Sequence, residues 1–133
     1  MAKADIKKDI KMSDNVTIKG RKFVFKIPNA WDGCAIFNML CTFELPFGLS
    51  NVVGLKSFKR PLNPAELEQL MKLCLTYCYE KISTSETNEP NYAQVVDSDG
   101  QIGIIGGESA PLLTKIFCQY INFFMDRWRR EAI

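Results

Sequence analysis

Apolar and polar residues alternate along two stretches of the chain, and this alternation predicts two β-hairpins. In residues 16–27, apolar positions lie on both sides of a Lys19-Gly20 pair and form one face. A period of two is typical of strands with one buried side. Residues 92–105 repeat the pattern around Asp99-Gly100, a pair that provides the positive φ angle of tight hairpin turns. We therefore expect hairpins at about 16–27 and 92–105.

Apolar residues spaced three and four positions apart predict three helices. The first, over residues 30–43, follows a potential N-cap at Asn29. The second, over residues 64–82, opens on the capping-box sequence Asn63-Pro64-Ala-Glu66, and the third covers residues 110–130. The side chains that we expect the first two helices to bury are Cys34, Phe37, Leu40 and Cys41, then Leu67, Leu70, Met71, Cys74, Tyr77, Cys78 and Ile82.

These elements predict one α+β domain over residues 15–133, preceded by a flexible basic arm over residues 1–14. The length of 133 residues suits a single hydrophobic core. The arm alternates charged residues with a few isolated apolar ones, which is too sparse a pattern for a stable helix.

The complete absence of histidine narrows the chemistry of the chain. It excludes imidazole bases, histidine-containing triads and histidine-ligated metals. The five cysteines are Cys34, Cys41, Cys74, Cys78 and Cys118. They lie among apolar residues without a CxxC pair, so we expect core thiols rather than metal ligands. An odd cysteine count, no secretory signal and no apolar run of membrane-spanning length together predict a cytoplasmic protein without a membrane anchor.

The stretch from Asp97 to Glu108 contains partial matches to two ligand-binding loops. A calcium loop needs a ligand where Gln101 stands and a glycine where Ile102 stands. A phosphate loop needs a Gly-Lys-Ser/Thr ending, which this stretch lacks. A nucleophilic cysteine would need a base, and no imidazole is available. We therefore expect no catalytic activity, no cofactor and no metal.

The last predicted helix has an unusually wide apolar face, covering about half of its circumference rather than a stripe of about 100°. Either this helix is central to the core, or another molecule covers part of its aromatic face. The apolar loop at 45–62 presents the same choice. The residues that we expect to bind a partner are Phe47, Val52, Phe58, Phe117, Tyr120, Phe124 and Trp128.

Four segments together suggest a family. They are the hairpin at 16–27, the helix opened by Trp31-Asp-Gly-Cys-Ala-Ile-Phe37, the Asp97-Ser-Asp-Gly-Gln-Ile-Gly103 hairpin and the closing helix Leu112–Trp128. In this order they resemble the small tail assembly chaperones of long-tailed bacteriophages. The resemblance implies a non-catalytic, self-associating protein of the infected bacterial cytoplasm. It also implies binding to the apolar, helical tape-measure protein while tail tube protein subunits assemble, and absence from the finished virion.

Two other functions remain open from the sequence. The same surfaces suit a structural tail or baseplate component that stays in the virion. The basic half at residues 1–60, with 11 basic and 5 acidic side chains, suits a small nucleic-acid-binding regulator. A net charge of +2 and an isoelectric point of about 8.3 argue against nucleic acid. The expected partners are therefore other tail proteins and further copies of this chain, forming a homo-oligomer.

Overall fold

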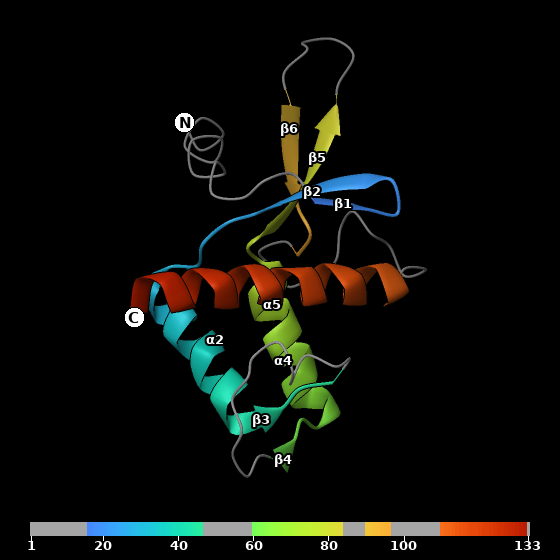
Figure 1. Cartoon of the computed structure of the whole chain (residues 1–133). Helices are drawn as coiled ribbons and strands as arrows, with labels where there is room; N and C mark the ends of the chain where they lie inside the picture. The colour runs from blue at the N-terminus through green and yellow to red at the C-terminus, as the bar shows by residue number, and fades with distance from the viewer. Residues whose placement is uncertain (1–15, 47–59, 84–89, 97–109, 133) are drawn as a thin grey trace.

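The computed structural model describes residues 16–46, 60–83, 90–96 and 110–132, and within them the chain has an α+β fold, as predicted (Figure 1). Its helices are α2 (Ala30–Thr42), α4 (Pro64–Leu75) and α5 (Ala110–Ala132). Its strands are β1 (Val16–Ile18), β2 (Arg21–Phe25), β3 (Phe43–Glu44), β4 (Arg60–Pro61), β5 (Cys78–Ser83) and β6 (Pro90–Gln94). The predicted arm at residues 1–14 lies outside the described residues.

Strands β1, β2, β5 and β6 form an antiparallel sheet in that order. The predicted first hairpin is confirmed, and its strands end at Phe25 rather than at Ile27. Lys19 and Gly20 both have positive φ angles, 52° and 80°, which is the backbone of a tight two-residue hairpin turn. The register places Phe23 opposite Glu80. Phe23 and Phe25 lie on the same face of β2, and both side chains belong to the hydrophobic core.

The second helix is shorter than predicted, because it ends at Leu75 rather than at about Ile82. The following residues form β5, which pairs with β2 on one side and with β6 on the other. In this segment Cys78 is in the main core, whereas Tyr79 packs with Val24 on the opposite face of the sheet. The backbone groups of the hairpin strand β2 need a partner strand, and this pairing outweighs the local helical pattern.

The first strand of the predicted second hairpin is confirmed. Residues 90–94 form β6, and this strand pairs with β5, which precedes it in the chain. The expected turn at Asp97–Gly100 and the strand after it lie outside the described residues. The sheet is therefore built from the β5–β6 pair next to the β1–β2 hairpin, as Figure 1 shows.

Helix α5 crosses the molecule between the sheet and the pair α2 and α4 (Figure 1). Ile116, Phe117 and Tyr120 are fully buried in one cluster that contains residues of the sheet and of all the helices. The Tyr120 ring meets Phe25 edge-on at 5.5 Å, and its hydroxyl donates a hydrogen bond to the carbonyl of Lys26 at 3.0 Å. The apolar face of α5 is wide because the helix packs on both sides.

Both predicted helix starts are present. The Asn29 side chain accepts from the amide of Asp32 at 2.8 Å, and the capping box pairs Asn63 and Glu66 in both directions, at 2.8 and 3.0 Å. Arg60 forms an ion pair with Glu66 and lies over the ring of Phe43, 4.5 Å from its centroid. These contacts join the short parallel strands β3 and β4 to the start of α4.

Candidate functional site

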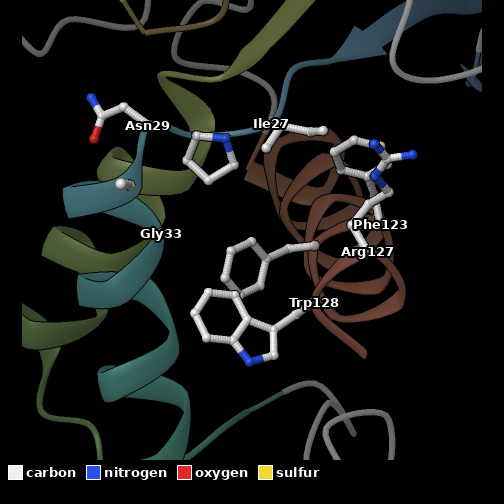
Figure 2. A pocket seen from close by; sticks show the side chains of 9 residues that line it. Ile27, Asn29, Gly33, Phe123, Arg127 and Trp128 are labelled. Atoms are coloured by element: carbon white, nitrogen blue, oxygen red, sulfur yellow. The ribbon is translucent and has the colours of Figure 1, made fainter. Parts of the chain in front are cut away.

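An apolar pocket lies where the second half of α5 meets the start of α2, and Figure 2 shows it from close by. Its volume is about 230 Å³. One wall consists of aromatic rings from α5, and the other consists of small or compact residues at the end of the sheet and the start of α2; Arg127 and Asn29 add polar groups. The main wall residues are Phe123, Phe124 and Trp128, and Pro28, Ala30 and Gly33. We call this hollow the aromatic pocket.

Ring stacking holds the aromatic wall of the pocket in place. The indole of Trp128 lies almost parallel to the ring of Phe37, with centroids 4.5 Å apart and an interplanar angle of 10°. The ring of Phe124 also contacts the indole, with centroids 5.5 Å apart and an interplanar angle of 32°. A Cβ at Gly33 would lie 3.8 Å from both Trp128 and Pro28, so this position of α2 packs directly against the pocket wall. The pocket therefore depends on contacts between α2 and α5, which are far apart in the sequence.

Replacing Gly33 with alanine should stabilise the protein. A Cβ at 3.8 Å from its neighbours is in ordinary van der Waals contact, so no atom has to move. Alanine in a helix interior is favoured over glycine by about 0.5–1 kcal/mol. We expect the free energy of unfolding in urea to rise by about that amount. A loss of stability instead would mean that Pro28 and Trp128 approach α2 more closely than the structure indicates.

A hydrogen-bonded group fixes the start of α2 beside the pocket. The hydroxyl of Tyr77, in the turn between α4 and β5, donates to the carboxylate of Asp32, which also contacts the Asn29 amide. Burial and this bond to Asp32 raise the pKa of Tyr77 to about 12. The phenol therefore stays protonated at neutral pH and holds α2 against the α4–β5 turn. The small-residue wall of the pocket is thus positioned by the fold rather than by a ligand.

The predicted partner-binding residues have different positions. Phe124 and Trp128 line the aromatic pocket; Phe124 is 4% exposed and Trp128 is half-buried. Phe117 and Tyr120 are completely buried in the core, so a partner cannot reach them on the folded chain. The remaining three, Phe47, Val52 and Phe58, lie outside the described residues. The structure therefore brings together the two predicted residues nearest the carboxyl end of α5.

Trp31 is a surface residue that the sequence analysis did not select. Among the residues that the structure describes, it is the large apolar side chain that stands exposed, at 86%. It lies in the first turn of α2, whose buried face is Gly33, Ile36 and Leu40. The signal was present in the sequence, because Trp31 is on the opposite side of the helix from Ile36 and Leu40.

Two expectations for apolar helix faces need correction. Cys34 was expected in the core but is exposed, and Cys41 is only half-buried, because the side of α2 that is buried contains Gly33 and Ile36 instead. Cys74 and Cys78 are buried, as expected, and burial raises the pKa of both thiols.

The exposed side of α4 differs from expectation in the same way. Leu67 and Met71 were expected to be buried but are half-buried, because they border a second apolar hollow. This hollow has a volume of about 320 Å³ and lies between α4 and the start of α5, where Leu113 forms part of its wall. We call it the α4 hollow. None of the described residues that line it is aromatic, so it differs in chemistry from the aromatic pocket.

Both hollows are lined mainly by apolar groups. Within the described ranges, no three potential ligands gather as a metal site, and no helix has the length and apolar character needed to cross a membrane. Comparison with known proteins gives no match: no family model, no curated protein and no solved structure aligns with the chain. The resemblance to tail assembly chaperones therefore stays a prediction.

Proposed function

We propose that this protein is a non-catalytic assembly chaperone that holds an apolar helical client at the aromatic pocket. The observation that carries the proposal is the pocket itself, which Phe124 and Trp128 line together with the small residues Ala30 and Gly33. Figure 2 shows the indole of Trp128 directed towards the helix that carries Gly33. A concave apolar site with an aromatic wall suits one bulky side chain projecting from a helix. Arg127 at the same site suits a polar or acidic group beside that side chain.

The resemblance to tail assembly chaperones of long-tailed phages supports a more specific version. The client would be the tape-measure protein, held in the host bacterial cytoplasm until tail tube protein subunits cover it. A chaperone of this kind has to release its client. Burial of one large apolar side chain contributes about 1.5–3 kcal/mol, which is compatible with reversible binding.

The client proposal predicts that Trp128→Ala weakens binding of an apolar helix. The probe is a labelled amphipathic helical peptide with leucine and phenylalanine on one face, titrated by fluorescence anisotropy. Truncating an aromatic residue at the centre of a contact commonly costs about 2 kcal/mol or more, so we expect the affinity to fall by roughly 30-fold. A second variant, Ala30→Leu, should also weaken binding, because it narrows the pocket from its exposed rim.

The matched control is Met71→Ala, which shortens a half-buried apolar side chain at the α4 hollow. It should bind the peptide like the unchanged protein, and circular dichroism should show all variants folded. If the Trp128 and Ala30 variants bound the peptide as tightly as the unchanged protein, or if only the Met71 variant lost affinity, binding at the aromatic pocket would be contradicted.

Mass spectrometry of purified virions separates the two tail functions. A chaperone should be absent from the virion, whereas a structural component should be retained in it.

A further inference from the structure

Trp31 stands exposed on the same helix that supplies the small-residue wall of the aromatic pocket. Its indole is 86% exposed, although a large apolar side chain is normally buried or in contact with a partner. The neighbouring residues Cys34 and Ala35 are also exposed and carry no charge. Ala30, the residue before Trp31, and Gly33 line the pocket. A projecting ring and a hollow that suits a ring thus both lie at the start of α2.

We propose that two copies of this chain pair by exchanging Trp31, so that the indole of each copy enters the aromatic pocket of the other. A patch that contains both a projecting group and its receptor is self-complementary, which is the condition for a closed two-fold dimer. This inference goes beyond the proposed function, because it concerns a second copy of the chain rather than a client. It needs the pocket but does not depend on the client.

The pocket and the indole agree in size and chemistry. An apolar cavity of about 150 Å³ is enough to bind benzene, so a pocket of about 230 Å³ has room for a larger aromatic ring such as an indole. The rings of Phe124 and Trp128 provide faces and edges for aromatic contacts, and the guanidinium of Arg127 adds a cation for the indole face. A tryptophan therefore satisfies the lining residues better than an aliphatic side chain.

The area involved predicts a weak dimer. One tryptophan buries about 150–250 Å² and covers a similar area of its receptor, so two exchanged residues remove roughly 600–1,000 Å² in all. Stable specific interfaces start at about 1,000 Å² and most are larger. The pair should therefore form at high protein concentration and separate on dilution, with the pocket then free for other apolar groups.

A two-fold exchange also predicts which residue lies near the symmetry axis. Around the axis of α2, Cys34 lies about 60° from Trp31 on one side and about 40° from Ala30 on the other. It therefore lies between the projecting indole and the pocket. In an isologous pair the midpoint of this patch is next to the two-fold axis, so the two Cys34 thiols should come close together. Cys34 is exposed and available to a cross-linking reagent.

The first test is sedimentation velocity of the full chain from about 10 µM to about 1 mM, the range in which weak pairs dissociate. We expect the unchanged protein to shift from monomer to dimer over this range. Trp31→Ala, which removes the indole, and Ala30→Leu, which narrows the pocket, should both remain monomeric. The matched control Asn38→Ala changes an exposed polar residue two turns along the same helix and should dimerise normally.

The second test is cross-linking with a short bis-maleimide, which joins two thiols without oxidation. We expect a covalent dimer of the unchanged protein that is lost in Cys34→Ala and much reduced in Trp31→Ala. A protein that stays monomeric throughout, or a Trp31→Ala variant that associates and cross-links like the unchanged chain, would overturn the exchange. Peptide binding separates this inference from the proposed function, since Trp31→Ala abolishes pairing but leaves the pocket able to bind the helical probe.

Discussion

The variant Phe124→Asp is expected to be unfolded at room temperature. The Phe124 ring is 4% exposed and belongs to the hydrophobic core, in contact with Trp128. Losing a buried phenylalanine costs about 3–5 kcal/mol, and a carboxylate in its place adds several kcal/mol through desolvation. The sum is comparable with the whole stability of a small domain, about 5–15 kcal/mol. Far-UV circular dichroism and sedimentation should show an expanded chain without the native spectrum.

The matched control for this change is Trp31→Asp. It introduces the same charge, but the replaced side chain is exposed and contributes little to the core. Its free energy of unfolding should stay within about 0.5 kcal/mol of the original value. If Phe124→Asp gave a folded monomer with an unchanged urea midpoint, the ring would be an interface residue and the core described here would be wrong at that position.

The protein is also expected to lose stability steeply in alkali. Burial raises the pKa of the Cys74 and Cys78 thiols, and burial likewise raises the pKa of the Tyr120 phenol. In the unfolded chain a thiol ionises at about pH 8.5 and a phenol at about pH 10. Each group that stays protonated in the folded state thus stabilises it fully below these values. The contribution is lost as the pH rises from the unfolded pKa towards the folded one.

The expected loss is about 1.4 kcal/mol per pH unit for each group that ionises only on unfolding. The two thiols should therefore make the free energy of unfolding fall as the pH rises above about 8.5, and Tyr120 makes the fall steeper above about pH 10. Urea unfolding followed by circular dichroism at successive pH values measures this slope. The double variant Cys74→Ala/Cys78→Ala should flatten it, whereas Cys34→Ala should not. A pH-independent stability up to about pH 11 would contradict the burial of these groups.

The width of the apolar face of α5 was visible in the sequence, but its cause was not. Periodicity measures how much of a helix is apolar, and it does not identify what covers each side. Phe117 and Tyr120 had been considered for a partner surface, yet the sheet and the helices cover them on both sides of α5. Whether these residues lie in the core or at an interface depends on where the β5–β6 pair and α4 pack. That packing is determined by residues from the whole chain rather than by α5 alone.

The end of α4 shows a different limit of sequence reasoning. Local spacing favours a helix up to Ile82, and the segment becomes a strand because β2 needs a neighbour. Helix starts were predicted well, since the caps at Asn29 and Asn63 act within four residues. Elements that depend on neighbours nearby in the chain are thus predictable, whereas strand pairing between distant segments requires the fold.

The aromatic pocket was half predictable for the same reason. Phe124 and Trp128 stood out as bulky residues on one helix, so the aromatic wall could be proposed in advance. The opposite wall depends on Gly33 and Pro28, which carry no apolar pattern and matter only because α2 and α5 meet there. Trp31 was overlooked because the buried face of α2 had been assigned with the wrong rotation about the helix axis.

Helix α5 follows every other described element in the chain, yet it supplies much of the core on which those elements pack. A ribosome therefore delivers the sheet, α2 and α4 before the segment that covers their apolar sides. Until α5 leaves the exit tunnel, Phe25, Ile36 and Leu40 have no complete core to enter. Folding should thus wait until α5 has been synthesised rather than progress element by element, and nascent chains stalled before Ala110 should bind chaperones and be cleaved by proteases.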